Sequence, residues 1–389
     1  MKRWYIILLA LLFVACHHDE NEPDVVSQRV VIVYMAAENS LSGYATSDVN
    51  EIRRATGNIP DSCKVVVYMD GSSDEMPQIL TFDNRKGEQT LYKYKFDPIS
   101  TDSSTMQQVL ELVIQRCPAR SYGLVLWSHG SGWIPEPPTT PAKAQPKKTI
   151  GIDNGQNTYD NTGKEMEITT LANILRRTNA EWDYIFFDAC FMQGVEVAYE
   201  LRDITDWCIG SPAEIPAEGA PYDYIMGSLF AEKEQVWTIA RDYYEYYLNN
   251  GGLVISVIRT SEMEALAQAT RPYLQGLSEY PNTASIQRYL SFKSSKQWKP
   301  EYFDMGSAMS EWLNEEEYPK WRDALYRAVP YHYFTQRWRS SFMNLSGWYP
   351  IITVPDEFVS CVSMYIPIKD RVLNEHFTRT SWYRDVWKP

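Results

Sequence analysis

Short apolar runs alternate with amphipathic segments along the first part of the chain. Runs with the length and composition of buried strands cover residues 29–35, 64–69, 122–127, 184–187 and 206–210. Segments with apolar positions at helical spacing lie between them, at residues 42–55, 103–117 and 168–178. This alternation predicts an α/β sandwich, in which helices cover both faces of a mainly parallel central sheet.

The remaining elements extend this picture. Residues 78–82 and 90–94 flank a turn rich in Asn and Gly, which predicts a hairpin, and Asp102 is available to cap the helix at 103–117. Beyond residue 231 the pattern predicts helices at 236–248 and 261–277 around a strand at 252–258. This C-terminal α/β extension is rich in Trp and Tyr, and we expect it to pack on the first part.

The apolar period changes from strand to helix around Cys190. The strand at 184–187 is followed by apolar residues at helical spacing, namely Phe191, Val195, Ala198 and Leu201. We therefore expect Cys190 at a strand-to-helix turn, where backbone N–H groups and a helix amino end favour the thiolate. The pattern predicts a nucleophile. The competing interpretation is a small buried hydrophobe, which is what most free cysteines are.

A nucleophile needs a base, and His129 is the candidate. His17 and His18 lie in the leader region, and His332 and His376 lie late in the chain. His129 follows the strand at 122–127, so it also lies at the carboxyl end of a strand. Two parallel neighbouring strands would bring His129 and Cys190 together at one edge of the sheet.

The chain has one apolar strand followed by His129-Gly130 and a second followed by Asp188-Ala189-Cys190. This pair of motifs resembles the signature of the caspase, gingipain and legumain clan of cysteine peptidases. Within that clan the chain is most similar to the clostripain family. Further matches are residues 33–41, residues 127–133, and Ser211, Pro216 and Gly219. The resemblance covers residues 30–224 well and continues more weakly to the end of the chain.

The resemblance implies a cysteine endopeptidase of caspase-like fold. Cys190 would attack the peptide carbonyl, His129 would protonate the leaving amine, and the N–H groups of Gly130 and Cys190 would bind the oxyanion. Glycine at 130 suits this role because it leaves room for the substrate. An alternative of another class is a non-catalytic surface-binding protein on the same scaffold.

The family counterpart of Asp188 lies at the base of the pocket for P1, the residue preceding the cut. A carboxylate there would select Arg or Lys. The structural alternative is that Asp188 caps a helix starting near Phe191. Ser211 and Glu214 would line the pocket rim, although relatives carry their second acidic residue at the position of Ala213. Preference for Asp, Asn or a small residue at P1 therefore stays open.

Residues 134–148 hold five prolines and three lysines, a composition that cannot form a packed element. A surface insertion is one interpretation. Clostripain-like enzymes are matured by a cut between the His and Cys segments after a basic residue, so the resemblance implies an autoprocessing loop here. Lys147 or Lys148 would be the cleavage site, with Lys143 as the next candidate.

The amino-terminal residues predict export. A basic start and a short apolar core at residues 4–15 precede Cys16, which resembles a bacterial lipoprotein cleavage box. An ordinary signal peptide with a chance cysteine is the alternative. We expect a signal peptide at 1–15, an acidic tether at 16–28, a catalytic domain at 29–232 and a C-terminal part at 233–389. The cleavage box predicts a lipid on Cys16 that anchors the protein to the outer membrane of a Gram-negative bacterium, on its periplasmic side or at the cell surface. The acidic run after Cys16 resembles the surface-export signal of Bacteroidetes lipoproteins.

Composition and net charge limit the kinds of molecule that the protein would bind. The chain has 389 residues, 44% of them hydrophobic, and a formal charge of −13, which disfavours nucleic acid as a partner. We expect a monomer that acts on peptides or proteins.

Four further cysteines, Cys63, Cys117, Cys208 and Cys361, permit three pairings, among which sequence cannot choose. Metal-ligand spacing is absent, so no metal site is predicted; calcium, which occurs in the family, is an optional cofactor.

Overall fold

The computed structural model describes residues 26–72, 76–134, 150–153, 155, 163–277, 282–289, 302–340, 351–367 and 371–389. Its strands are β1 (Ser27–Ala37), β2 (Cys63–Gly71), β3 (Gln78–Asp83), β4 (Gly87–Lys93), β5 (Ala119–Trp127), β6 (Ile150–Asp153), β7 (Lys164–Met166), β8 (Trp182–Asp188), β9 (Thr205–Gly210), β10 (Val254–Arg259), β11 (Phe303–Asp304), β12 (Tyr331–Phe334) and β13 (Ser363–Met364). Its helices are α1 (Ser42–Arg54), α2 (Ser103–Arg116), α3 (Ile168–Arg177), α4 (Val195–Glu200), α5 (Tyr222–Ile225), α6 (Trp237–Tyr247), α7 (Met263–Leu274), α8 (Met305–Trp312), α9 (Glu317–Ala328) and α11 (Arg371–Phe377).

One large sheet organises the described residues. It has nine strands within them, in the order β12-β10-β9-β8-β5-β1-β2-β3-β4. The central strands β9, β8, β5, β1 and β2 are parallel to one another, while β3, β4, β10 and β12 join in antiparallel pairs at the two ends. The predicted α/β fold with a mainly parallel centre is confirmed, as is the hairpin of β3 and β4.

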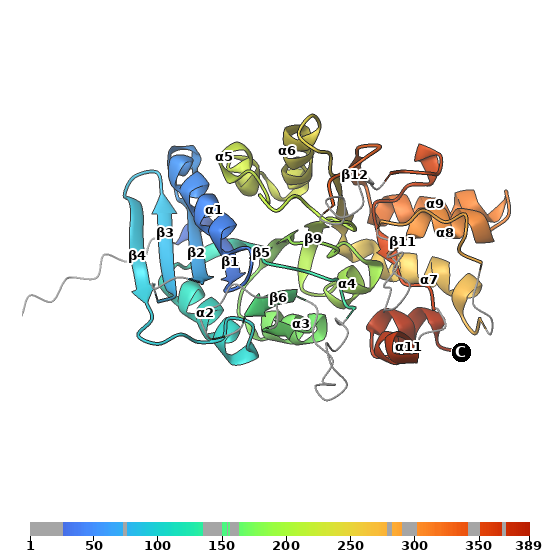
Figure 1. Cartoon of the computed structure of the whole chain (residues 1–389), viewed down its shortest axis with the longest axis horizontal. Coiled ribbons are helices and arrows are strands. Elements are labelled where there is room, and N and C mark those ends of the chain that lie inside the picture. Colours follow the sequence, from blue (N-terminus) through green and yellow to red (C-terminus); the bar gives the residue numbers. More distant parts are fainter. Residues whose placement is uncertain are drawn as a thin grey trace, which may run out of the picture.

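Helices cover both faces of this sheet (Figure 1). Alternate residues of β1 enter different apolar clusters, because successive side chains of a strand point to opposite faces. Val31 and Val33 pack in a cluster with α1, α5 and α6, whereas Val30 and Ile32 pack with α2, α3 and α4. The central strands are apolar on both faces for this reason, as buried parallel strands require.

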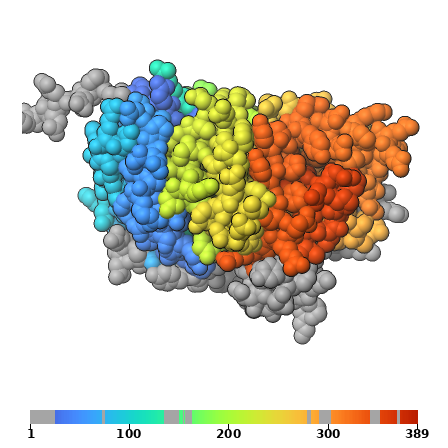
Figure 2. Space-filling model, turned by 90° about the horizontal axis from the view of Figure 1, so that it is seen from above, coloured from blue at the N-terminus to red at the C-terminus, as the bar shows by residue number. Residues whose placement is uncertain are grey.

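The part of the chain after residue 232 is continuous with the first part. Strands β10 and β12 extend the central sheet beyond β9. In Figure 2 the orange and red surface of this part follows directly on the yellow-green surface of α5 and α6. Gln193 joins the two parts. Its side-chain amide donates to the backbone carbonyl of Ser256 on β10 at 2.9 Å, and its backbone carbonyl accepts from the N–H of Ser363 at 2.9 Å.

One predicted helix cap is not formed. Asp102 precedes α2 but does not cap it with its side chain, which instead lies 3.4 Å from the Lys164 ammonium on β7, so the predicted cap is wrong.

The four described cysteines other than Cys190 are buried and unbridged, namely Cys63, Cys117, Cys208 and Cys361. Among the residues that the structure describes, no helix combines the length and apolar character needed to cross a membrane.

Candidate active site

His129 and Cys190 lie at the same edge of the sheet. Trp127, the last residue of β5, is in register with Asp188, the last residue of β8, and each candidate follows two positions later. The two loops are in contact, because a β-carbon added at Gly130 would lie 2.6 Å from the carbonyl oxygen of Cys190. The predicted juxtaposition of the two loops is therefore correct, and only glycine fits at position 130 without displacing the Cys190 backbone.

The loop that carries Cys190 is fixed by the loop that follows β9. The N–H of Phe191 donates to the carbonyl of Ala213 at 3.0 Å, and the N–H of Gln193 donates to the carbonyl of Ser211 at 3.0 Å. The N–H of Ile215 points at the sulfur of Cys190, 3.5 Å away. Three consecutive parallel strands, β5, β8 and β9, thus contribute one loop each to the site.

The expected helix directly after Cys190 is absent from this position. Phe191 has a φ of 60°, in the left-handed region, and α4 begins only at Val195. Cys190 therefore lies too far from a helix amino end to benefit from it. Burial, followed by the charge of Glu214, raises the pKa of the Cys190 thiol to about 12, although the bond from Ile215 opposes this shift. The expectation that this environment favours the thiolate is wrong.

The imidazole of His129 contacts the loop after β1. Its Nε2 lies 3.0 Å from the hydroxyl oxygen of Ser40. The neighbouring Ser128 hydroxyl donates to the carbonyl of Ala36 at 2.6 Å, and the Asn39 side-chain amide donates to the carbonyl of Ile152 at 2.9 Å. These bonds lock together the loops after β1 and β5 and the strand β6, so they fix the backbone that carries His129.

Asp188 is buried and held by hydroxyl and amide donors. It is 2% exposed, and its carboxylate accepts from the N–H of Ala220 at 3.0 Å and from the hydroxyls of Tyr222 at 2.9 Å and Tyr243 at 3.5 Å. Burial raises the pKa of Asp188 to about 6, and these three bonds limit the rise. The helix-cap interpretation of Asp188 is wrong, because α4 begins seven residues later.

A second buried carboxylate, Asp48, lies beside this site and was not predicted from the sequence. It comes from α1, is 2% exposed, and accepts a hydrogen bond from the indole nitrogen of Trp127 at 2.7 Å. Burial, followed by the charge of Asp188, raises the pKa of Asp48 to about 9. Its signal in the sequence is an acid on the apolar face that α1 forms with Ala45, Val49 and Ile52.

Ser211 and Glu214 form hydrogen bonds with different parts of the chain. The Ser211 hydroxyl donates to the carbonyl of Ala213 at 3.1 Å and accepts from its N–H at 3.0 Å, so this side chain closes the turn after β9. Glu214 accepts a hydrogen bond from the hydroxyl of Ser340. Cys16, Lys143, Lys147 and Lys148 lie outside the described residues.

Three other carboxylates form a group next to the carboxyl ends of β1 and β2. Glu38, Asp70 and Asp97 each place an oxygen within 4.8 Å of the others. Burial, followed by the charges of Asp153 and Asp97, raises the pKa of Asp70 to about 9. Carboxylate oxygens are ligands that calcium prefers, so these are the described side chains best arranged to hold such a cation.

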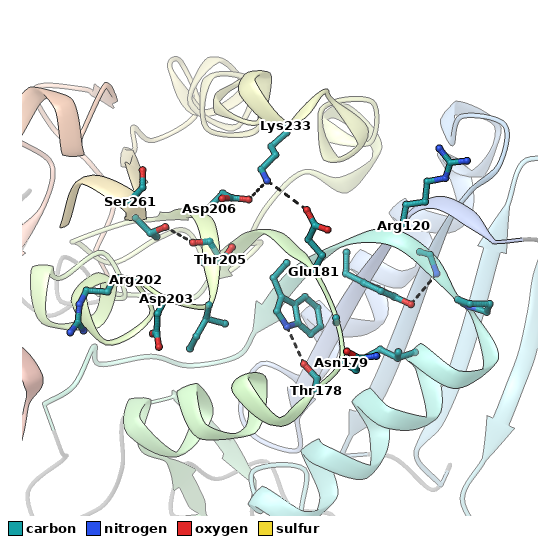
Figure 3. A pocket seen from close by; sticks show the side chains of 18 residues that line it. Arg120, Thr178, Asn179, Glu181, Arg202, Asp203, Thr205, Asp206, Lys233 and Ser261 are labelled. Atoms are coloured by element: carbon teal, nitrogen blue, oxygen red, sulfur yellow. Dashed lines mark hydrogen bonds and ion pairs between the residues drawn. The ribbon is translucent and has the colours of Figure 1, made fainter. Parts of the chain in front are cut away.

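A polar cavity of about 870 Å³ lies at the other edge of the sheet, where β5, β8 and β9 begin (Figure 3). Lys233 reaches across it to Asp206 and to Glu181, the latter at 3.8 Å. Its lining includes Trp182 and Thr205, the first residues of β8 and β9. This cavity is therefore separated from Cys190 by the length of the strands and is not the candidate active site.

Known proteins similar to this chain belong to one protease family. The model of the clostripain family, peptidase C11, matches residues 33–345. An inactive zymogen of a C11 protease from Parabacteroides distasonis is 29% identical, with a TM-score of 0.78, over 93% of this chain and 99% of that one. A secreted C11 cysteine protease from Bacteroides thetaiotaomicron, solved with an irreversible peptide inhibitor, is 30% identical, with a TM-score of 0.77, over 92% of this chain and 99% of that one. No curated protein matched the chain.

Proposed function

Because the chain belongs to the clostripain family of cysteine proteases, we propose that Cys190 and His129 are its catalytic dyad. The observation that carries this proposal is the register of β5 and β8, which brings the two loops together at the carboxyl edge of the sheet. Gly130 and Cys190 would supply the N–H groups that bind the oxyanion. The Ser40 contact would hold the imidazole in one orientation.

In the proposed reaction the sulfur of Cys190 attacks the peptide carbonyl carbon. The C–N bond breaks, the proton lost by the thiol reaches the leaving amine through His129, and a thioester remains. Water then hydrolyses the thioester and regenerates the thiol. Because burial raises the pKa of the Cys190 thiol, the proposed reaction needs a base, His129, to take its proton.

The proposed P1 residue is Arg or Lys. The support for this is the buried carboxylate of Asp188, which lies two residues before the nucleophile at the end of the same strand. A buried carboxylate attracts a cationic side chain and disfavours P1 Asp through repulsion. Asn and small residues are the alternatives that remain to be compared. Glu214 would contribute at the rim, near the sulfur that its charge affects.

Peptide reporters that differ only at P1 test this specificity. We expect the largest kcat/KM for Arg and Lys, and lower values for Asn, Ala and Asp. Faster cleavage after Asn, Ala or Asp would overturn the basic preference while leaving the peptidase assignment in place. In the same assay Cys190→Ala should lose all cleavage, and persistent activity in the purified variant would refute the dyad.

We also propose that the enzyme matures by cutting its own loop at 134–148, after Lys147 or Lys148, with Lys143 as the next choice. One similar structure is an inactive zymogen, which supports a precursor form. Incubation of the purified precursor should give two fragments whose new termini are read by mass spectrometry. Cys190→Ala should stay intact, and a fragment pattern unchanged in that variant would show that another protease makes the cut.

Export with a lipid on Cys16 is proposed from the leader and the acidic residues after it. A similar C11 protease is described as secreted, which supports export. Mass spectrometry of the mature amino terminus should find diacylglycerol on Cys16. An unmodified start at a later residue would contradict the anchor.

A further inference from the structure

We propose that Tyr302, from the C-terminal part of the chain, is a positioning residue that sets how the loop of His129 lies against the loop of Cys190. This inference rests on the proposed dyad and goes beyond it, because it assigns a role in the reaction to a residue far after the nucleophile in the sequence. Tyr302 acts through the backbone of the two loops and does not itself touch the reacting atoms.

The Tyr302 side chain contacts both loops. Its hydroxyl donates to the carbonyl of Ser131, two positions after His129, at 2.9 Å. Its ring stacks on that of Phe191, the residue directly after Cys190, with ring centres 4.4 Å apart and planes inclined by 15°. Tyr302 is 5% exposed, so both contacts are made away from bulk water. One rigid ring therefore links the two loops.

The backbones of the two loops also meet beside this ring. Gly132 has a φ of 70°, and a β-carbon added there would lie 2.9 Å from the carbonyl oxygen of Phe191 and 3.8 Å from Cε1 of Tyr302. Both the φ and the close approach favour glycine at this position. Because the packing is this close, a change in the ring should shift the two loops relative to each other.

The stacked partner of Tyr302 has an uncommon backbone conformation. Phe191 has a φ of 60°, which residues with a side chain rarely adopt. Such a conformation persists where the surrounding contacts impose it. Here the N–H of Phe191 is bonded to the carbonyl of Ala213, and its ring is covered by Tyr302. Since this φ sets the direction in which the chain leaves Cys190, the stacking helps to fix the backbone of the nucleophile.

Tyr302 is in turn held by the C-terminal part. Its carbonyl accepts from the N–H of Tyr289 at 2.9 Å. The two residues that follow it form β11, which pairs with β13, and the N–H of Ser363 on β13 donates to the carbonyl of Gln193 at 2.9 Å. The segment of Tyr302 is thus bonded, through this small sheet, to the segment after Cys190. This arrangement gives the C-terminal part a role in the geometry of the candidate active site.

Two variants test the proposal, because Tyr302→Phe removes the bond to Ser131 and keeps the stacked ring, whereas Tyr302→Leu removes both. The assay uses one peptide reporter and purified enzymes in the same state of processing. We expect kcat to fall roughly 10-fold in Tyr302→Phe and roughly 100-fold in Tyr302→Leu, the scale on which small displacements of catalytic groups act. KM should stay within about twofold in both variants, because neither removes a contact to substrate.

The matched control is Tyr184→Phe, which removes a bond of the same kind near the amino end of β8. There a buried tyrosine hydroxyl donates to the carbonyl of Leu229 at 2.8 Å. The control should leave kcat unchanged, even if its melting temperature falls as much as that of Tyr302→Phe. An unchanged kcat in Tyr302→Phe, a loss in KM alone, or an equal loss of kcat in Tyr184→Phe would overturn the proposal.

Alkylation of Cys190 by iodoacetamide gives a readout besides peptide cleavage. If His129 takes the thiol proton, displacement of its loop in Tyr302→Leu should slow alkylation at neutral pH toward the rate in His129→Ala. A wild-type rate in Tyr302→Leu would contradict the positioning role. Persistent cleavage in Cys190→Ala would refute the proposed dyad and this inference with it. An inactive Cys190→Ala together with a fully active Tyr302→Phe would refute the role of Tyr302 alone.

Discussion

At the scale of single residues, the site depends on the absence of a side chain at Gly130. The loop of His129 passes so close to Cys190 that a β-carbon at position 130 would lie 2.6 Å from the Cys190 carbonyl oxygen and 3.0 Å from the sulfur of Met192. Contacts this short force the backbone to move. The backbone N–H at 130 would move with it.

We expect Gly130→Ala to lower kcat/KM roughly 100-fold, the scale on which small displacements of catalytic groups act. Peptide cleavage measured under saturating and limiting substrate separates this loss into kcat and KM, and the loss should lie mainly in kcat. The control is Gly43→Ala on α1, where an added β-carbon would meet no atom within 4 Å. Equal activity of the two variants would contradict the close-packed loop.

The positions of the candidate residues could be predicted from the sequence where they follow from strand ends. His129 and Cys190 each follow an apolar strand, and parallel strands present their carboxyl ends at one edge. The contact of Asp48 with Trp127 could not be predicted, because nothing local shows which buried group an acid on the apolar face of a helix will meet. The raised pKa of Cys190 also depends on burial by distant segments, which no local pattern contains.

At the scale of elements, a buried ion pair ties the amino ends of β1 and β8 across β5. Arg29 on β1 lies 2.6 Å from Asp183 on β8, and both side chains are at most 10% exposed. The same guanidinium donates to the carbonyl of Ala231. This contact holds the strands in register at the edge opposite to the loops that carry His129 and Cys190.

Replacing Asp183 by Ala should lower the free energy of unfolding by about 3–5 kcal/mol, because it leaves the Arg29 charge buried without its partner. Chemical denaturation with tryptophan fluorescence measures this change. The control is Asp206→Ala, which removes a roughly half-exposed partner of Lys233 and should cost less than about 1 kcal/mol. Similar losses of unfolding free energy in both variants would contradict the prediction that the buried pair stabilises the fold more than the exposed one.

The elements that the sequence predicts best are the ones fixed by apolar periodicity, such as β1, α1 and β8. The helix after Cys190 was predicted too early for a physical reason. The N–H groups of Phe191 and Gln193 are bonded to the loop after β9, so they are not available to a helix. The small hairpin of β6 and β7 has strands too short to give a pattern of their own.

At the scale of the whole molecule, several buried carboxyl groups lose their protons at a higher pH in the folded state than in the unfolded chain. Burial raises the pKa of Glu196 to about 7, that of Asp188 to about 6, and those of Asp48 and Asp70 to about 9. In the unfolded chain these groups titrate near pH 4. The folded protein therefore binds more protons than the unfolded one at neutral pH.

Since the folded state binds the extra protons, its stability should fall as pH rises from about 4 toward about 9. Free energies of unfolding measured at pH 5, 6, 7 and 8 check the sign. Glu196→Gln should flatten the part of the curve between about pH 5 and pH 7, because it removes the titration of Glu196. Stability that increases steadily with pH over this range would contradict the assignment of protonated buried acids.

The direction of the parallel strands has a consequence for how the enzyme would meet its substrates. Strand β1 begins at Ser27 and runs 11 residues, roughly 35 Å, to the edge that carries the reactive loops. A molecule held at a bilayer through its leading residues would present its cutting face outward, away from the lipid headgroups. If Cys16 carries the proposed lipid, polypeptides in the surrounding medium could dock without passing between the enzyme and the membrane.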